Sequence, residues 1–560
     1  MSQSLIAFDT NHIKSYVFGT NKLKEIRGAS SLLDKLNRNE TVNEAKKFRN
    51  MIEVYAYGGS ALFVVDSDKA EEIGKAVQRL YHEQTGGGAS ITYAIQHIPD
   101  YSVKNIMTDE DLGGNVMMSD VLKLLRLRLR MAKDSLSMDG TAQEVKQAYT
   151  EPTSIALPSH PLLSTCDSCG DAYAQDVWRD SEDPGDEGFY CRRCMGKREE
   201  DKDVKMMLRI RRKADLPNET LWGRIIRSLG NDYLPSDGSI PQRPQDFNDF
   251  RGFTHGKEYL GLIYADANGM GKAMEKQPSL QKLREFAEKI DDAVFATMGQ
   301  AITTHLPLQG AKGKTFPFDV LLIGGDDIVL VTPADKAMQV AQTLGDSFHK
   351  TTGETLSIGA VLAPVKYPFA LLYSLVDETL KAAKKSGAKL QKGTNSNSND
   401  DKQDKTRVNF VVVTGNTSLG YQKQYSEMHR EPEGGNKNEF YATLRPYALS
   451  DLNWLIEQLQ QGNQKRLGRT KLHQLREAIL KLDQTTSIVE ALALLRNWRK
   501  DERDFMKDMV LHFDTRSTKR QKDMGPLFPW FLDGAENNES QSVYRTPLLD
   551  FIELYDFVLS

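Results

Sequence analysis

The sequence has few cysteines, no long apolar run and almost no excess charge. Within its 560 residues, no stretch reaches the roughly 18 consecutive apolar residues of a membrane-spanning helix. A net charge of −4 gives no overall basic field, so any nucleic-acid binding must be local. The N-terminus shows neither a basic leader nor a cleavage site. We therefore expect a cytoplasmic protein with no membrane partner.

The cysteines all fall in one segment, as two C-x-x-C knuckles. They are Cys166 and Cys169, followed after a polar loop by Cys191 and Cys194. Such clustering argues for a metal site rather than a disulfide framework. Four thiolates complete a tetrahedral zinc site and leave no position open for a substrate. We predict one structural Zn²⁺ on these residues, with a redox pair as the weaker alternative.

The stretch Gly324-Gly325-Asp326-Asp327 lies between two apolar runs. That pattern predicts a β-hairpin whose tight turn carries adjacent carboxylates. Like charges between buried strands repel each other unless a cation binds. Carboxylate oxygens suit Mg²⁺ or Mn²⁺. From this stretch alone, a solvated turn is an equally good interpretation.

An upstream apolar run, residues 259–265, ends on Asp266. Neighbouring strands lie about 4.8 Å apart, so a strand beside the hairpin brings Asp266 opposite Asp326 and Asp327. Three carboxylates there can hold two metal ions about 3.5–4 Å apart, as in polymerases and cyclases. The three aspartates are therefore the predicted metal ligands.

Residues 356–361 predict a further core strand, and residues 370–387 have helical spacing with a glycine stop at Gly387. Lys384 lies near that stop. On spacing alone, Lys384 is best interpreted as a partner of the helix C-terminal dipole.

The chain contains a diverged internal repeat of this unit. Three features recur: an Asp-x-Asn strand end, a Gly-Gly turn and a serine-led strand. They occur at Asp9 and Asp266, at Gly58-Gly59-Ser60-Ala61 and Gly324-Gly325-Asp326-Asp327, and at Ser90-Ile91-Thr92 and Ser357-Ile358-Gly359. The first copy lacks paired acids and should not hold two metals, but its glycines can let a nucleotide approach the backbone. A purely structural first copy is the alternative.

The remaining segments carry weaker signals. Residues 110–150 predict a helix on which Arg126, Arg128 and Arg130 are solvated or partly packed rather than bound to RNA. Residues 391–405 predict a low-complexity loop, and a helical pattern begins at residue 451. The late aromatics Trp530, Phe531 and Phe551 are predicted to be core residues rather than a base-stacking platform.

Taken together, these motifs resemble the palm of the GGDEF and nucleotidyl-cyclase superfamily. The Gly-Gly-Asp-Asp form resembles the large polymerase-cyclase subunit of type III CRISPR effector complexes, and residues 21–33 resemble the start of the first palm in the Cmr (III-B) branch. The resemblance implies a catalytic role for the three aspartates and a triphosphate contact for Lys384. The nucleotide-binding residues expected on this basis are Gly58, Gly59, Ser60, Asn268, Gly324, Gly325, Ser357 and Lys384.

Larger members of that family carry an N-terminal HD nuclease domain. None of the ten histidines here is followed by aspartate, and the first palm pattern begins at residue 5. We therefore expect no HD-type nuclease activity.

The expected fold is α+β, with two ferredoxin-like palms, a zinc module between them and a C-terminal helical domain. The expected boundaries are 1–155 for the degenerate palm, 156–250 for the zinc module and connector, 251–420 for the catalytic palm and 421–560 for the helical domain.

The resemblance implies a synthase that polymerises and cyclises ATP into cyclic oligoadenylate. Its expected partners are ATP, a guide RNA, a target RNA and other subunits of a CRISPR complex, with two Mg²⁺ or Mn²⁺ as cofactors. Two alternatives stay open: a stand-alone cyclase, and a non-catalytic scaffold of an RNA-guided complex.

Overall fold

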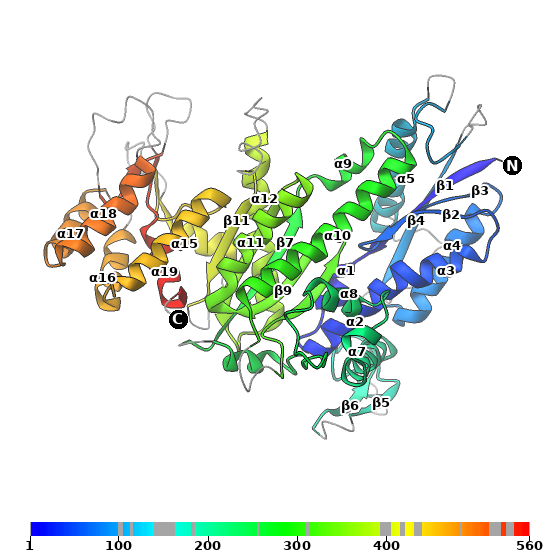
Figure 1. The fold of residues 1–560 in the computed structure, drawn as a ribbon, viewed down its shortest axis with the longest axis horizontal. Helices are drawn as coiled ribbons and strands as arrows, with labels where there is room; N and C mark the ends of the chain where they lie inside the picture. The colour runs from blue at the N-terminus through cyan, green and yellow to red at the C-terminus, as the bar shows by residue number, and fades with distance from the viewer. Residues whose placement is uncertain are drawn as a thin grey trace.

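The computed structural model describes residues 2–98, 105–112, 116–138, 163–180, 185–254, 257–308, 314–391, 405–414, 420–430, 439–481, 484–514, 528–533 and 543–558. Figure 1 shows three parts in a row along the longest axis: an N-terminal sheet with its helices, a larger central sheet, and a C-terminal group of helices. None of the helices within these residues is long and apolar enough to cross a membrane.

The first sheet has four strands in the order β2-β3-β1-β4. In chain order the elements are β1 (Gln3–Asn11), α1 (Ile13–Phe18), α2 (Leu23–Lys35), the π-helix η1 (Leu36–Glu40), α3 (Thr41–Lys46), β2 (Ile52–Tyr57), β3 (Ser60–Asp66), α4 (Ala70–Thr85), β4 (Ser90–His97) and α5 (Met118–Met138). One face of this sheet packs on α2, α3 and α4, and the other packs on α5.

The second sheet has six strands in the order β14-β11-β10-β7-β9-β8. Its elements are β7 (Tyr259–Ala267), α9 (Met270–Glu275), α10 (Leu280–His305), β8 (Asp319–Gly324), β9 (Asp327–Pro333), α11 (Ala334–Thr352), β10 (Leu356–Pro364), α12 (Phe369–Gln391), β11 (Arg407–Val412) and β14 (Tyr447–Ala448). The order β10-β7-β9-β8 repeats the order β4-β1-β3-β2, with helices at the same places in the chain. The predicted internal repeat of a ferredoxin-like unit is confirmed.

Both faces of the second sheet are covered. The helices α10 and α11 pack on one face, and α12 with the first copy covers the other. The strands β9 and β10 are therefore buried along nearly their whole length, which explains why they read as continuous apolar runs instead of alternating ones. The N-cap Ser279 accepts a hydrogen bond from the Lys282 backbone N–H, and this bond helps to set the start of α10.

The two copies pack against each other reciprocally. The helix α2 of the first copy lies against β8 of the second, and α10 of the second copy lies against β2 of the first. Their packed faces share the same apolar clusters: Leu321 and Leu322 of β8 lie in one with residues of α2, and Leu280 and Leu283 of α10 lie in another with residues of the first sheet. The strand ends that carry the candidate site therefore lie where the two copies meet.

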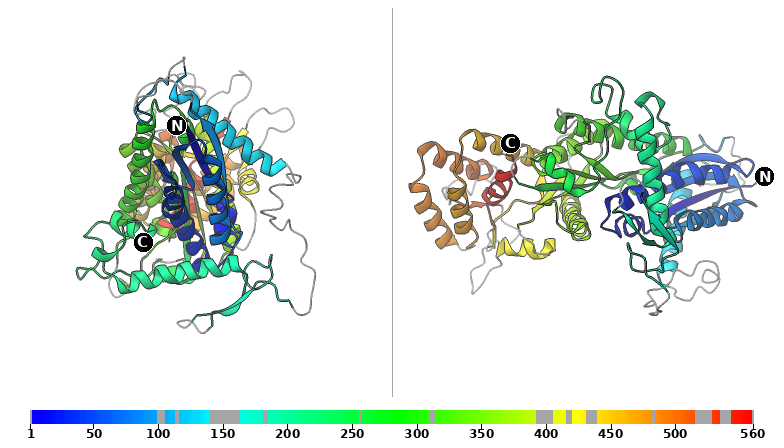
Figure 2. Two further views of the ribbon diagram at one scale, coloured as in Figure 1. Left: turned by 90° about the vertical axis from the view of Figure 1, so that its right-hand side faces the viewer. Right: turned by 90° about the horizontal axis from the view of Figure 1, so that it is seen from below.

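Between the copies lies a small module followed by a connector. Its elements are the hairpin β5 (Asp176–Arg179) and β6 (Glu187–Tyr190), α7 (Arg192–Ile210), the short 3₁₀ helix η2 (Lys213–Asp215), α8 (Leu221–Ser228) and the 3₁₀ helix η3 (Phe247–Gly252). Figures 1 and 2 both show the β5–β6 hairpin projecting from the body of the molecule, whereas α7 lies along that body.

The C-terminal part is helical, as predicted, but it also contains a small sheet in the order β12-β13-β16-β15. Its elements are α14 (Tyr421–Glu427), β12 (His429–Arg430), β13 (Glu439–Tyr441), α15 (Leu449–Gln464), α16 (Arg469–Ile479), α17 (Gln484–Arg496), α18 (Lys500–Asp514), β15 (Phe531–Leu532), β16 (Val543–Arg545) and α19 (Leu548–Val558). Strands this short leave no alternation for a sequence pattern to detect. Trp530, Phe531 and Phe551 are buried, so their prediction as core residues is confirmed.

Two other predicted segments are partly described. The helix expected over 110–150 is α5 over Met118–Met138, and residues 139–150 lie outside the described chain. Arg126 and Arg130 on α5 are solvent-exposed, and Arg128 donates to the Ile95 carbonyl at 2.9 Å, in agreement with a partly packed helix. In the predicted loop over 391–405, residues 392–404 lie outside the described residues.

Candidate functional site

The β8–β9 hairpin holds its carboxylates at a two-residue turn. Strand β8 ends at Gly324 and β9 begins at Asp327, so Gly325 and Asp326 form the turn. Gly325 has a φ of 62°, a backbone conformation that residues with a Cβ atom rarely adopt. In the sheet register, Asp327 lies directly opposite Asp266 of β7. The structure therefore brings the three predicted aspartates to one end of neighbouring strands.

Burial makes the carboxyls of Asp326 and Asp327 costly to ionise. Burial, together with the charge of Asp266, raises the pKa of Asp326 to about 7. Burial and then the Asp266 charge raise the pKa of Asp327 well above its usual range. The Asp327 Oδ1 atom is buried without a hydrogen-bond partner. An orphaned oxygen among repelling carboxyls fits a site that binds a cation.

The aspartates are not gathered as tightly as a closed metal site. Among the described residues, only the four cysteines form a group of three or more potential ligands whose donor atoms all lie within 4.8 Å of one another. Asp266 instead pairs with the Lys384 ammonium, which supplies positive charge on that side of the site.

Lys384 does not lie at the end of its helix. The helix α12 continues through Gly387 to Gln391, so the predicted stop at Gly387 is wrong. One glycine costs a helix interior only about 1 kcal/mol, which packing of α12 against β10 outweighs. Because the last turn lies beyond it, Lys384 is not the dipole partner suggested by spacing; it faces Asp266 instead.

Asn268 and Ser357 bind to each other. The Ser357 hydroxyl donates to the Asn268 side-chain oxygen at 2.7 Å, and the Asn268 amide donates to the Thr355 hydroxyl at 3.0 Å. Ser357 is fully buried. These bonds hold the end of β7 against β10, and the expected contact of both residues with a nucleotide stays a prediction.

The glycine turns of the two copies touch. A Cβ on Gly58 would lie 2.4 Å from the Gly325 Cα and 2.5 Å from its backbone nitrogen. Gly58 itself has a φ of 59°. Backbone atoms cannot move aside as a flexible side chain can, so glycine is required at this contact. Gly58, Gly324 and Gly325 thus let the two hairpins approach each other.

Strand register corrects the predicted match between the two turns by one residue. Asp9 lies opposite Ser60 just as Asp266 lies opposite Asp327. Ser60 therefore takes the place of Asp327, not of Asp326.

Backbone hydrogen bonds support the same shift. The Thr10 N–H donates to the Gly59 carbonyl at 2.8 Å, as the Ala267 N–H donates to the Asp326 carbonyl at 3.2 Å. Gly59 therefore takes the place of Asp326. The letters Gly-Gly align in sequence, but the strands place the turn one residue later in the second copy. The first copy still lacks paired carboxylates.

The serine match is also shifted. Asp9 lies opposite Thr92, and Asp266 lies opposite Ser357. The Asn11 amide donates to the Thr92 hydroxyl at 2.8 Å, the counterpart of the Asn268–Ser357 bond. Thr92, rather than Ser90, is the equivalent of Ser357.

Lys14 is a site residue that the sequence analysis missed. It lies on α1 of the first copy, yet its ammonium is 3.0 Å from Asp377 of α12 and 4.8 Å from the ring centroid of Tyr264. Its charge offsets part of the rise in the pKa of Asp327. No sequence signal identified Lys14, because its partners lie in the other copy.

The two C-x-x-C knuckles converge. The donor atoms of Cys166, Cys169, Cys191 and Cys194 lie within 4.8 Å of one another, and three of the four residues are buried. A hydrogen bond from Cys191 lowers the pKa of the Cys169 thiol. Four converging sulfurs fit a tetrahedral metal ion better than four protonated thiols.

The helix α7, which starts at the second knuckle, is joined to α2 of the first copy by buried ion pairs, and Arg27 of α2 also binds β8 of the second copy. Arg198 of α7 lies 2.7 Å from Glu25 of α2, and both side chains are fully buried. Arg27 of α2 lies 3.2 Å from Asp201 of α7 and 3.0 Å from Asp319 of β8.

The crossing of α2 and α7 is close. A Cβ on Gly28 would lie 1.7 Å from the Lys197 carbonyl oxygen, so glycine is needed where these helices meet. The module that carries the four cysteines is thereby joined to the contact between the copies.

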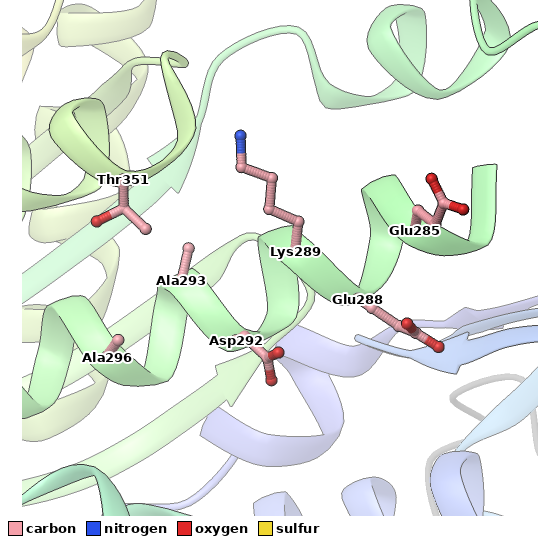
Figure 3. A pocket seen from close by; sticks show the side chains of 7 residues that line it. All are labelled: Glu285, Glu288, Lys289, Asp292, Ala293, Ala296 and Thr351. Carbon is pink, nitrogen blue, oxygen red and sulfur yellow. The ribbon is translucent and has the colours of Figure 1, made fainter. Parts of the chain in front are cut away.

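A hollow of about 450 Å³ lies elsewhere, on the helical layer. Figure 3 shows its lining side chains on α10 and at the end of α11. They are Glu285, Glu288, Lys289, Asp292, Ala293, Ala296 and Thr351. None of the predicted site residues lines it.

Comparison with known proteins agrees with this architecture. Residues 259–392 match the family model described as Cas10/Cmr2, second palm domain. Similar solved structures include Csm1–Csm4 cassettes in complex with cA4 (TM-score 0.57, 14% identity, covering 100% of this chain and 70% of that chain), with pppApA (0.56, 15%, 100% and 69%) and with AMPPNP (0.54, 14%, 100% and 70%). These likenesses show the fold. No curated protein sequence matches the chain.

Proposed function

We propose that the protein is a metal-dependent nucleotidyltransferase that joins ATP into cyclic oligoadenylate, because residues 259–392 match the family model described as Cas10/Cmr2, second palm domain. A ribose hydroxyl of one ATP bonds to the α-phosphorus of another, and pyrophosphate leaves. The observation that carries the proposal is the cluster of Asp266, Asp326 and Asp327, with a buried, unpartnered Asp327 oxygen, at the contact between two palm copies.

In this proposal the aspartates hold Mg²⁺ or Mn²⁺, which supplies electrostatic stabilisation to the reacting phosphate and to the leaving pyrophosphate. Lys384 pairs with Asp266, and its half-exposed ammonium would be the group that binds a triphosphate if a metal ion neutralised that carboxylate. Lys14 brings a second cation from the first copy.

The remaining contacts serve positioning. The hydrogen bond between Asn268 and Ser357 keeps β7 and β10 in register at the point where Ser357 lies opposite Asp266. The touching glycine turns set the distance between the two copies, and with it the distance between two nucleotides. The first copy, with Gly59 and Ser60 in place of the paired acids, is proposed to hold the nucleotide that provides the hydroxyl.

The four cysteines are proposed to bind one structural Zn²⁺. We also propose that the chain works in an RNA-guided complex with other subunits, because solved structures of similar fold are Csm1–Csm4 cassettes bound to cA4, pppApA or AMPPNP. The division at residues 1–155, 156–250, 251–420 and 421–560 belongs to the same proposal.

The test is synthesis by an Asp326→Ala/Asp327→Ala variant. Wild-type protein, supplied with its partner subunits, guide RNA, target RNA, ATP and Mg²⁺, should form cyclic products identifiable by mass. The double variant should form none and should unfold at the wild-type temperature or above, because it removes partly buried carboxyls that repel Asp266 and each other. Asp292→Ala, an exposed aspartate on α10, is the matched control.

Two results would contradict the proposal. One is wild-type product formation by the double variant. The other is the absence of any ATP-derived product from wild-type protein in the complete complex, which would favour a scaffold role. If the isolated chain is equally active without RNA or partner subunits, the stand-alone cyclase is the better assignment.

A further inference from the structure

The helix α5 is the structural counterpart of α12. It follows β4 as α12 follows β10, and each packs on its own sheet. Asp9 lies near the end of β1, on the face covered by α5, and the Lys133 ammonium lies 2.5 Å from its carboxylate. In the second copy Lys384 pairs with Asp266 in the same way. Each copy thus retains one aspartate and one lysine at the same place.

The two sites differ in charge. The second has Asp326 and Asp327, where the first has Gly59 and Ser60. About two helical turns before Lys384, α12 carries Asp377; about two turns before Lys133, α5 carries Arg126.

Both of these residues reach across to the short helix of the other copy. Asp377 pairs with Lys14 of α1, and Arg126 lies 2.5 Å from Glu275 of α9. The polarity of the pair is reversed between the two sites. Where the second site concentrates carboxylates, the first presents two cations.

We propose that Arg126 and Lys133 bind the polyphosphate of the nucleotide in the first copy directly, so that this site needs no metal ion. An arginine fork and a lysine ammonium are the side chains that suit phosphate oxygens. Their present partners release them easily, because both ion pairs are partly exposed and such pairs contribute little stability. The inference rests on the proposed function only for the identity of the nucleotide.

This arrangement also explains how two similar palms can perform different tasks. The nucleotide at the carboxylate site is activated by metal, whereas the nucleotide at the cationic site is anchored with its phosphates away from metal. Only one of the two α-phosphates is then exposed to attack.

The experiment measures bound ATP by equilibrium dialysis of the full chain with radiolabelled ATP. In EDTA, with the zinc content of the protein shown by elemental analysis to be unchanged, wild type should bind about one ATP per chain, and in Mg²⁺ about two. The Arg126→Ala/Lys133→Ala variant should lose at least tenfold in affinity in EDTA and keep the Mg²⁺-dependent site. Lys123→Ala, an exposed lysine on the same helix, should match wild type.

Two further arms separate binding from damage to the fold. Asp9→Asn should bind ATP several-fold more tightly in EDTA, since it removes the carboxylate that competes for Lys133; a damaged fold would not gain affinity. Inorganic tripolyphosphate should compete with ATP in EDTA, and adenosine should not.

The inference is overturned if wild type binds no ATP in EDTA, if the Arg126/Lys133 variant keeps wild-type affinity there, or if adenosine competes and tripolyphosphate does not. These readouts do not depend on product formation. Suppose that the Arg126→Ala/Lys133→Ala variant loses ATP binding in EDTA and that wild type makes no product in the complete complex. That result would refute the proposed function and leave this inference standing.

Discussion

The contact between the two glycine turns yields the sharpest quantitative prediction. In Gly58→Ala, the new Cβ would lie 2.4 Å from the Gly325 Cα, whereas ordinary contacts begin at 3.4 Å. The obstacle is backbone, so the hairpins must separate by about 1 Å. A misplacement of about 1 Å between reacting groups can cost about 100-fold in rate. We therefore expect Gly58→Ala to slow oligoadenylate synthesis by about two orders of magnitude.

A second cost must be kept apart from the first. Alanine at a φ of 59° also carries a left-handed strain of about 1–2 kcal/mol. The matched control is Gly353→Ala at the end of α11, where φ is 77° and nothing lies within 4 Å of the new Cβ. Gly58→Ala should lose at least as much stability in urea unfolding as Gly353→Ala, because it adds a clash to a similar backbone strain, but only Gly58→Ala should lose synthesis.

The assay is the initial rate of cyclic product formation by the assembled complex at saturating ATP, with the folded fraction checked for each variant. A Gly58→Ala rate within about twofold of the Gly353→Ala rate would refute the reasoning. It would mean that the distance between the turns does not control the reaction.

The other predictions concern stability. Cys166→Ser should release the zinc, about one per chain by elemental analysis, and lower the unfolding temperature, since bound zinc contributes folding free energy; an unchanged zinc content would contradict the site. Arg27→Ala should destabilise the fold by about 3–5 kcal/mol in urea unfolding, because it leaves the fully buried Asp319 without its partner. Lys75→Ala, at an exposed ion pair, should cost less than about 1 kcal/mol, and equal losses for the two would argue against the buried network. His12→Gly should leave the unfolding temperature unchanged or raise it slightly. His12 has a φ of 55°, a strain that glycine avoids, although glycine loses more chain entropy on folding. A clear fall in the unfolding temperature would oppose this.

Much of the candidate site could be predicted from local sequence. Apolar runs around Gly-Gly-Asp-Asp predict a hairpin, and the Asp-x-Asn ending predicts that Asp266 stands at a strand terminus; both elements are present. The two C-x-x-C knuckles predicted a convergent group of sulfurs. Each of these patterns depends on a few neighbouring residues and on turn or ligand chemistry.

Other features could not be predicted in this way. The match between the two Gly-Gly turns was wrong by one residue, because strand pairing, not the letters, sets which residue faces Asp9. The stop predicted at Gly387 failed because packing on β10 outweighs the cost of one glycine. Lys14, Arg126 and Lys133 gained their importance only from partners that the fold brings to them.

The sequence by itself determined the repeated unit, its hairpins, the acidic turn and the sulfur cluster, because alternation, turn residues and ligand spacing act over short stretches of chain. The tertiary structure alone decided how the copies oppose each other, and with this which charges meet. Gly58 and Gly325 touch although 266 residues lie between them in the sequence, and no local preference specifies that contact. It results from burying α2 against β8 and α10 against β2, so the electrostatic difference between the two sites is a property of the packed pair.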